Sequence, residues 1–200
     1  MIVQLLNIDK CYAIIKSILE VLFMKKIIFI EGLPTVGKTY LVNEIRKIKL
    51  KNVHIVDEII NKEILSPKTD SEDKFIKNDE MKVNKYKSGT IIIDRGPIST
   101  LVYNQLLHLI DNSYDATYIE KWFEQFIPIY ENDNTYNYYL NNPGVYNPSL
   151  DDPNNPFGSI DNLKLTHEIT LLNLRKYAKN YKIIEYDKKN LMEVINEIIG

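Results

Sequence analysis

The sequence predicts an α/β fold in three layers, with about five mostly parallel strands flanked by helices. Short runs of β-branched and aromatic residues alternate along the chain with longer segments whose apolar residues recur every three or four positions. The short runs are typical of strands buried on both faces of a parallel sheet, and the longer segments are typical of helices that cover such a sheet. Because the two kinds of segment alternate, right-handed crossovers between parallel strands are expected.

The first strand, loop and helix form the N-terminal unit of this pattern. Residues 27–30 are four consecutive apolar residues and predict a buried strand. A loop is expected at 32–39 and a helix over 40–50. The apolar face of that helix consists of Leu41, Ile45 and Ile48. The second strand is expected at 53–56, where β-branched residues return.

A polar stretch separates the second strand from the third. Residues 59–88 mix lysines with acidic residues, which favours a helix plus an exposed loop. Residues 90–93 predict a third buried strand. Ser99 is expected to be the N-cap of the next helix, which runs toward Ile110.

The C-terminal half continues the alternation. A helix is expected over 116–127, and its aromatic stripe is interpreted as core rather than as a binding surface. The fourth strand is expected at 136–140. The stretch 141–158, which is rich in proline and asparagine, is expected to form a loop. The remaining elements are a helix over 162–179, a strand at 181–186 and a helix over 189–199.

The chain is expected to hold a single domain over residues 24–200, because it has no repeats and no linker that would divide it. Residues 141–160 form a lid-like loop in this interpretation. Residues 1–23 form an N-terminal extension that is expected to be helical, since its branched residues have helical spacing. An alternative stays open, in which Met24 is the true start of the protein.

Charge and cysteine content restrict the partners. The 25 basic and 27 acidic side chains lack the basic surplus of a duplex-binding protein, so a small-molecule partner is favoured over long nucleic acid. Charged residues interrupt residues 1–23, so no membrane span is expected. Cys11 is the one cysteine, which excludes an internal disulfide and favours a reducing, cytoplasmic location.

The strongest functional signal is the loop between the first strand and the first helix. It matches the pattern G-x-x-x-x-G-K-[ST] at every fixed position, in the required context of strand and helix. Its residues are Gly32, Leu33, Pro34, Thr35, Val36, Gly37, Lys38 and Thr39. The glycines let backbone N–H groups converge on phosphate oxygens at a helix N-terminus. Lys38 is expected to reach the β- and γ-phosphates of ATP, and Thr39 to ligate Mg²⁺.

Charged residues follow two neighbouring predicted strands. Asp57 and Glu58 end the second strand, and Asp94 and Arg95 end the third. Ligands of open parallel sheets bind beyond the carboxyl ends of the strands, so all four side chains are expected near the phosphate loop. Capping of helices or pairing with rim lysines is the alternative interpretation.

Each of these side chains has a candidate role. Asp94 is expected to hold Mg²⁺ through water or to accept a proton, and Arg95 to stabilise charge on the transferred phosphoryl group or the acceptor. Asp57 or Glu58 is expected to be a general base toward an acceptor hydroxyl, and the choice between these two stays open.

The segment 91–103, which contains Asp94-Arg95, resembles the Asp-Arg or Glu-Arg motif of thymidylate kinases and deoxynucleoside kinases. Residues 163–168 are similar to the helix after the lid in deoxynucleoside kinases, and residues 182–187 resemble their last strand. The resemblance covers roughly residues 25–199.

This resemblance implies a P-loop kinase that transfers a phosphoryl group from ATP to a (deoxy)nucleoside or a nucleoside monophosphate. It implies that Arg95 contacts the acceptor's 5′ end or phosphate, that Asp94 lies near the metal, and that Asp57 or Glu58 takes the position of the base. Related kinases are often dimers, so the helix with Trp122 and Phe123 is a candidate homodimer interface.

The sequence departs from the family in its lid. The chain has three arginines, Arg46, Arg95 and Arg175, and none lies in the lid-like stretch, where Lys164 is the nearest cation. Stabilisation of the transferring group is then expected to rest on Lys38, Arg95 and Mg²⁺. Two alternatives follow: a P-loop kinase of another small molecule or a nucleic-acid end, and a non-kinase module that binds a nucleoside triphosphate.

Overall fold

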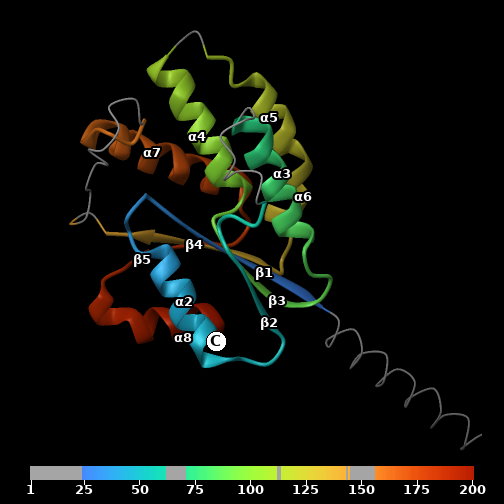
Figure 1. The fold of residues 1–200 in the computed structure, drawn as a ribbon. Coiled ribbons are helices and arrows are strands. Elements are labelled where there is room, and N and C mark those ends of the chain that lie inside the picture. The colour runs from blue at the N-terminus through green and yellow to red at the C-terminus, as the bar shows by residue number, and fades with distance from the viewer. Residues whose placement is uncertain (1–23, 62–70, 112–113, 143, 145–155) are drawn as a thin grey trace, which may run out of the picture.

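A sheet of five parallel strands forms the centre of the computed structural model, which describes residues 24–61, 71–111, 114–142, 144 and 156–200 (Figure 1). The strands are β1 (Lys25–Gly32), β2 (Val53–Val56), β3 (Gly89–Asp94), β4 (Thr135–Asn141) and β5 (Tyr181–Glu185). Their order across the sheet is β2-β3-β1-β4-β5, and every neighbouring pair is parallel. The predicted α/β class is confirmed, with all five strands at the expected positions.

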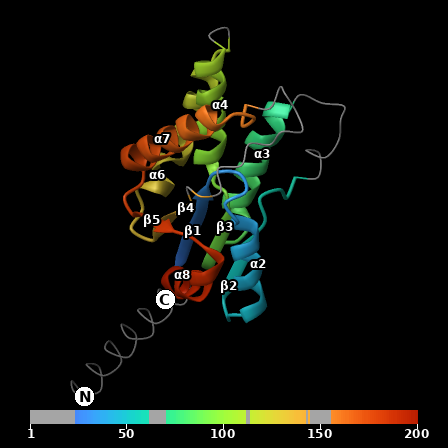
Figure 2. The same cartoon turned by 90° about the vertical axis from the view of Figure 1, so that its left-hand side faces the viewer.

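Helices cover both faces of the sheet and complete three layers (Figures 1 and 2). Helices α2 (Lys38–Ile48) and α8 (Leu191–Ile199) lie on one face. The opposite face carries α3 (Ser71–Asn84), α4 (Pro97–Ile110), α5 (Thr117–Phe123), α6 (Ile127–Tyr130) and α7 (Ile160–Tyr177). Two short 3₁₀ helices, η2 (Glu124–Phe126) and η4 (Lys188–Asn190), complete the described helical elements.

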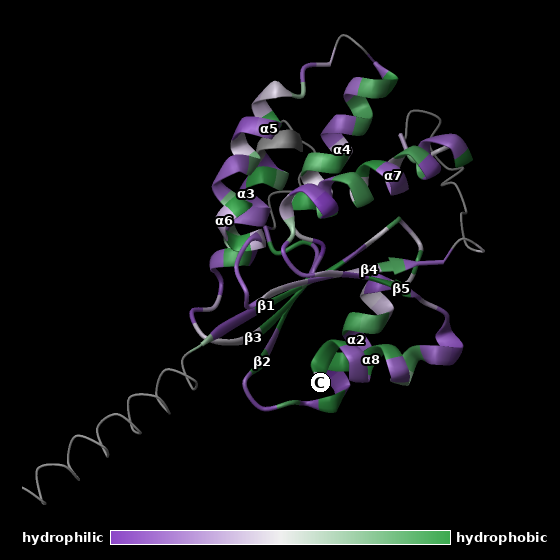
Figure 3. Cartoon of the chain, turned by 180° about the vertical axis from the view of Figure 1, so that it is seen from behind, coloured by the Kyte–Doolittle hydropathy of each residue, from purple (hydrophilic) through white to green (hydrophobic). Residues whose placement is uncertain are grey.

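The alternation of side chains along β1 supplies a core on each face. Ile28 and Ile30 pack with the helices α2 and α8, while Ile27 and Phe29 pack with the other helical layer. All four are buried, which accounts for the continuous apolar run in the sequence. The helices carry both hydrophilic and hydrophobic residues, as expected of segments with one face on a sheet (Figure 3).

The aromatic stripe of α5 and η2 lies in the core, as predicted. Trp122, Phe123 and Phe126 are buried, and Phe123 contacts the ring of Tyr130. These rings therefore offer little surface to a partner. A homodimer interface on α5 stays a prediction, and it would use outward residues such as Tyr118.

The predicted start of helix α4, with Ser99 as its N-cap, is wrong. Helix α4 has its N-cap at Gly96 and begins at Pro97, so Ser99 lies within its first turn. Proline is favoured at the first helical position because its fixed φ suits the helix and its missing N–H would have no partner there. The side chain of Ser99 is therefore available for another contact, which is described below.

Two predicted segments fall largely outside the described residues. They are the N-terminal extension 1–23 and most of the lid-like stretch 141–160, of which the last residue begins α7. No helix in the described part of the chain is both long and apolar enough to cross a membrane.

Candidate functional site

The phosphate loop connects the end of β1 to the start of α2, and its two glycines have positive φ angles of 146° at Gly32 and 100° at Gly37. A Cβ atom at Gly32 would lie 2.7 Å from the carbonyl oxygen of Leu140. A Cβ atom at Gly37 would lie 2.9 Å from the ring of Tyr186. Both positions therefore require glycine for space as well as for backbone conformation.

Lys38 folds over this loop. Its Nζ donates hydrogen bonds to the carbonyl oxygens of Gly32 at 2.9 Å and Leu33 at 2.7 Å, and the residue is only 4% exposed. Burial, together with the nearby charge of Arg95, lowers the pKa of the Lys38 ammonium to about 7. An anion bound in the loop would stabilise the charged form and raise this pKa.

Thr39, in the first turn of α2, lies beside Asp94, at the end of β3. The Thr39 hydroxyl donates to Asp94 Oδ2 at 2.8 Å. Asp94 Oδ1 is buried, and within the described residues it has no hydrogen-bond partner. Burial raises the pKa of the Asp94 carboxyl.

The Thr39 hydroxyl and the Asp94 carboxylate, with its one unpartnered oxygen, are oxygen ligands of the kind that suits Mg²⁺. The described residues contain no group of three or more His, Cys, Asp or Glu side chains that could hold a metal alone. The site therefore fits an ion that takes its remaining ligands from phosphate oxygens and water, as Mg²⁺ does in phosphate-binding sites.

Arg95 occupies the turn between β3 and α4 in a left-handed conformation, with φ of 59°. Its backbone N–H donates to the carbonyl oxygen of Ile30 at 3.1 Å, and its carbonyl oxygen accepts from Lys82 Nζ at 2.6 Å. A non-glycine residue holds this conformation only where its surroundings fix it, because the conformation costs about 1–3 kcal/mol.

The side chain of Arg95 forms an ion pair with Glu58, in which Nε lies 2.7 Å from Oε1. The Nε–H direction misses that carboxylate, so this buried donor has no hydrogen-bond partner among the described residues. The contact is thus electrostatic. The N–H remains able to donate to an oxygen of a ligand.

Asn78 of α3 holds the segment that carries Glu58. Its side-chain amide donates to the Glu58 carbonyl oxygen at 2.9 Å and accepts from the backbone N–H groups of Ile60 and Asn61 at 2.8 and 3.0 Å. Asp57, by contrast, forms a 2.5 Å ion pair with Arg46 and is not among the residues that line the cavity described next.

A cavity of about 610 Å³ lies between the phosphate loop, α3 and α4. Its apolar lining consists of Pro34, Phe75, Tyr103, Leu107 and Phe157, and its charged lining of Glu58, Asp79, Lys82 and Arg95. Each described cation of this lining has an acidic partner, because Lys82 Nζ lies 2.7 Å from Asp79 Oδ1 and Arg95 pairs with Glu58. The described part of the lining is thus close to electrically neutral.

The pair of Asp79 and Lys82 is buried, with 3% of each side chain exposed. Asp79 Oδ2 also accepts from the hydroxyl of Thr100 at 2.7 Å. This pair could not be predicted from the sequence, because oppositely charged residues three positions apart on a helix usually lie on a solvent face.

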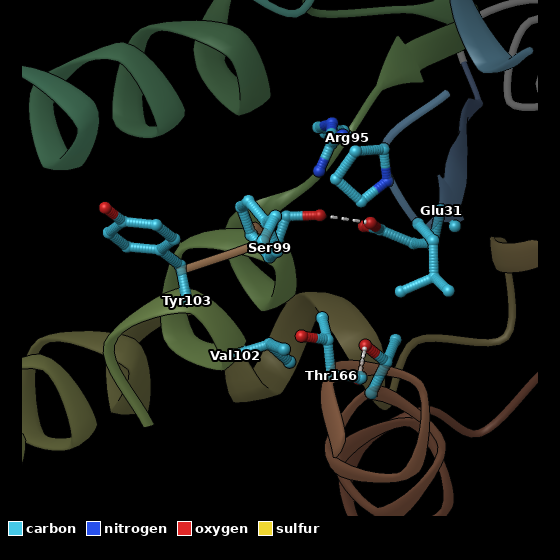
Figure 4. Close-up of a pocket in the computed structure, with 11 residues that line it drawn as sticks. Glu31, Arg95, Ser99, Val102, Tyr103 and Thr166 are labelled. Carbon is cyan, nitrogen blue, oxygen red and sulfur yellow. Dashed lines mark hydrogen bonds between the residues drawn. The ribbon is translucent and has the colours of Figure 1, made fainter. Parts of the chain in front are cut away.

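Glu31 is a second residue that the sequence analysis missed. It is the residue before Gly32, it is fully buried, and it lines a small cavity of about 20 Å³ beside the phosphate loop (Figure 4). Its carboxylate accepts from the Gly96 N–H at 2.8 Å and from the Ser99 hydroxyl at 2.6 Å. Burial raises the pKa of Glu31 to about 7, although both hydrogen bonds and the nearby Arg95 charge oppose this.

Known proteins resemble this chain in structure. A thymidylate kinase from Candida albicans covers 86% of the chain, with a TM-score of 0.56 and 15% identity, and 88% of that kinase is covered in turn. The chain has a P-loop kinase fold. A deoxyadenosine kinase from M. mycoides with bound dATP covers 86% of the chain, at a TM-score of 0.57 and 14% identity, with 97% of that kinase covered.

A NadR protein in complex with NR also shares the P-loop kinase fold, at a TM-score of 0.61 and 16% identity. It covers 88% of this chain, while this chain spans 51% of that protein. No protein-family model matches the sequence, and no curated protein matches it. At such low identity the likeness establishes the fold, and the acceptor must be inferred from the residues of the site.

The P-loop kinase fold brings most of the predicted site residues together. Lys38 and Thr39 belong to the phosphate loop and Asp94 lies beside it. Glu58 and Arg95 line the large cavity next to the loop. Lys164 does not contribute to either cavity, since its side chain is exposed and lies 3.8 Å from Asp161. The chemical roles of the site residues stay predictions.

Proposed function

We propose that the protein transfers the γ-phosphoryl group of ATP, with Mg²⁺, to the 5′ hydroxyl of a nucleoside or deoxynucleoside. The observation that carries this proposal is the pair of Glu58 and Arg95, which lies in the lining of the cavity of about 610 Å³ that adjoins the phosphate loop.

The donor half rests on the phosphate loop. Its backbone N–H groups and Lys38 supply positive charge to a triphosphate, and the N-terminus of α2 adds its dipole. Thr39 and Asp94 would hold Mg²⁺. When bound, this ion would neutralise part of the negative charge of the phosphates.

The size and lining of the large cavity support a nucleoside as acceptor. A volume of about 610 Å³ lies within the range of small-molecule sites. The aromatic rings of Phe75, Tyr103 and Phe157 offer apolar surface to a base, and the polar side chains of Asn104 and Thr100 lie in the same lining.

The charge balance of the cavity favours a neutral acceptor over a monophosphate. Arg95 is neutralised by Glu58, and Lys82 is neutralised by Asp79. A monophosphate would bring two negative charges next to the Glu58 carboxylate with no surplus cation from the described lining. A nucleoside hydroxyl brings none.

Glu58, in the lining of the cavity, has a clear task in transfer to a hydroxyl. Glu58 accepts the proton of the 5′ hydroxyl while that oxygen forms a bond to the γ-phosphorus of ATP. The bond from this phosphorus to the β–γ bridging oxygen breaks, and ADP leaves with the bond's electron pair. The unpartnered Nε–H of Arg95 donates to the transferring group or the 5′ oxygen, and Lys38 stabilises the charge that develops on the phosphates.

Equilibrium binding distinguishes the proposed acceptor from its competitors. Isothermal titration with deoxynucleosides, ribonucleosides and their 5′ monophosphates, in the presence of a non-hydrolysable ATP analogue and Mg²⁺, is expected to rank a nucleoside at least about tenfold tighter than its monophosphate. Glu58→Gln is expected to narrow that gap, because it removes the repulsive charge. Tighter binding of monophosphates to the wild type, or binding of no nucleoside at all, would contradict the proposal.

A further inference from the structure

Glu31 occupies a position where the two halves of the site meet. It is the last β1 residue before the phosphate loop glycine Gly32, and its carboxylate contacts the first residues after Arg95. Both contacts, from the Gly96 N–H and the Ser99 hydroxyl, come from the β3–α4 segment. A single buried side chain thus joins the loop that would hold the donor to the turn that carries the acceptor-side arginine (Figure 4).

The turn that Glu31 contacts has little room to move. A Cβ atom on Gly96 would lie 2.5 Å from the ring of Phe29 and 2.7 Å from the hydroxyl oxygen of Tyr130. The same Tyr130 oxygen accepts the backbone N–H of Ile98 at 3.1 Å. The peptide groups on either side of the turn are therefore packed against the core as well as hydrogen-bonded.

Three hydrogen bonds hold consecutive backbone groups of this turn. The Arg95 N–H donates to Ile30, the Arg95 carbonyl accepts from Lys82, and the Gly96 N–H donates to Glu31. The left-handed conformation of Arg95 depends on these contacts, because nothing in an arginine side chain favours it. Glu31 is the member of the set that also adjoins the phosphate loop.

We propose that Glu31 is a positioning residue, which acts through Arg95 by fixing the β3–α4 turn at a set distance from the phosphate loop. The proposal rests on the proposed function, because it assumes that Arg95 serves the acceptor side of the transfer. Glu31 itself touches neither substrate nor metal in this account. Burial is costly for a carboxylate, and the position of Glu31 is explained by the two donors that it organises, the Gly96 N–H and the Ser99 hydroxyl.

A double-mutant cycle tests whether Glu31 acts through Arg95. Glu31→Ala is expected to lower kcat/KM for phosphoryl transfer by about 100-fold, as a displacement of roughly 1 Å in a reacting group does. Arg95→Ala is expected to lower it by about 1,000-fold. The double variant is expected to match Arg95→Ala alone within about threefold, because the arginine that Glu31 positions is gone. Multiplicative effects, with a loss near 100,000-fold, would overturn the proposal.

Two further variants separate positioning from loss of structure. Glu31→Gln keeps an acceptor for Gly96 and a group that can hydrogen-bond Ser99, so it is expected to retain kcat/KM within about fivefold. Ser99→Ala removes one donor and leaves Glu31 in place, and it is expected to lower kcat by about tenfold with little change in the KM for ATP. An effect of Ser99→Ala confined to the KM for ATP would contradict the proposal.

A spectroscopic readout tests the same proposal without any acceptor. The chain has three arginines, so its Nε–H resonances are few, and Arg95→Lys assigns the signal of interest. Hydrogen exchange of the Arg95 Nε–H is expected to be slow in the wild type and in Glu31→Gln, and at least about tenfold faster in Glu31→Ala or Ser99→Ala. Unchanged exchange in both disrupting variants would overturn the inference even if transfer is observed. Accelerated exchange in a protein that phosphorylates no nucleoside would support the positioning role and reject the proposed function.

Discussion

The hydroxyl of Thr39 donates to a carboxylate oxygen of Asp94 across 2.8 Å, which joins the first turn of α2 to the end of β3. The second carboxylate oxygen of Asp94 is buried and lacks a hydrogen-bond partner in the described part of the chain. The two predicted magnesium ligands therefore already lie side by side, with one oxygen available for an ion or its water.

If Asp94 binds Mg²⁺, a substitution of Asp94 is expected to raise the Mg²⁺ concentration that phosphoryl transfer needs. Asp94→Asn keeps the size of the side chain and an acceptor for Thr39, but it removes the charge that attracts the ion. The Mg²⁺ concentration for half-maximal transfer is expected to rise about 10–100-fold. A magnesium titration of the transfer rate checks this, with Asp57→Asn as the matched control outside the cavity. Equal titrations for Asp94→Asn and the wild type would remove Asp94 from the metal site.

The lowered pKa of Lys38 predicts that the affinity for ATP depends on pH. The pKa of Lys38 is lowered to about 7, chiefly by burial, and bound phosphate would raise this pKa. The free protein therefore loses this charge above about pH 7, so binding must take up a proton there and affinity must fall as pH rises. Titration of Mg·ATP binding between about pH 7.5 and 9 is expected to show a loss approaching tenfold per pH unit.

Lys38→Arg is the control for this pH dependence, because a guanidinium keeps its charge over the same range. Its affinity at neutral pH is expected to be lower, since the larger group must fit the loop, but the dependence on pH should disappear. Lys47→Arg, at an exposed site on the same helix, should retain the wild-type dependence. A flat wild-type profile would mean that the Lys38 ammonium does not change its protonation on binding.

The structure separates the two acids that follow β2. Glu58 lines the large cavity beside Arg95, whereas Asp57 pairs with Arg46 in an exposed position. Glu58→Gln is expected to lower kcat for transfer to a hydroxyl about 100- to 10,000-fold, which is the usual contribution of a general base. Asp57→Asn is expected to change kcat by less than about twofold, because exposed ion pairs contribute little. Steady-state rates of both variants check the assignment, and the reverse order of effects would make Asp57 the base.

Breaking the buried ion pair of Asp79 and Lys82 is expected to lower the stability of the fold strongly. Lys82→Met leaves the Asp79 carboxylate buried, with Thr100 as its remaining partner among the described residues, and it frees the Arg95 carbonyl. The free energy of unfolding is expected to fall by roughly 3–5 kcal/mol, measured by chemical denaturation. Lys77→Met, on an exposed position of the same helix, is the matched control.

Replacing both Asp79 and Lys82 shows whether the loss of stability comes from the unpaired charge or from altered packing. The double variant Asp79→Leu with Lys82→Met is expected to recover at least about half of the lost stability, because no uncompensated charge remains. A loss in the double variant equal to the sum of both single losses would show that the ion pair is not the cause.

The sequence was sufficient for the sheet and for the phosphate loop. Both signals are local: a buried strand needs only a short apolar run, and the loop needs only Gly32, Gly37, Lys38 and Thr39 at fixed spacing. Asp94 and Arg95 were identified because a strand end in a parallel sheet has a known position relative to its neighbours.

The residues that the sequence did not reveal depend on distant contacts. Glu31 stands alone after an apolar run, and its role appears only when Gly96 and Ser99, more than 60 positions away, are placed beside it. The position of Glu58 in the lining of the large cavity likewise depends on Asn78, which lies 20 positions along the chain and holds the Glu58 carbonyl. Polar patterning on α3 gave no sign that its charged pair faces a cavity.

The fate of the γ-phosphoryl group tests the central claim most directly. Wild-type protein is incubated with γ-labelled ATP, Mg²⁺ and an equimolar mixture of nucleosides and nucleoside monophosphates, and the labelled products are identified by chromatography and mass spectrometry. The account predicts a labelled nucleoside 5′ monophosphate, formed at least about 100-fold faster than by Glu58→Gln. Label found only in nucleoside diphosphates, or only in inorganic phosphate, would contradict it.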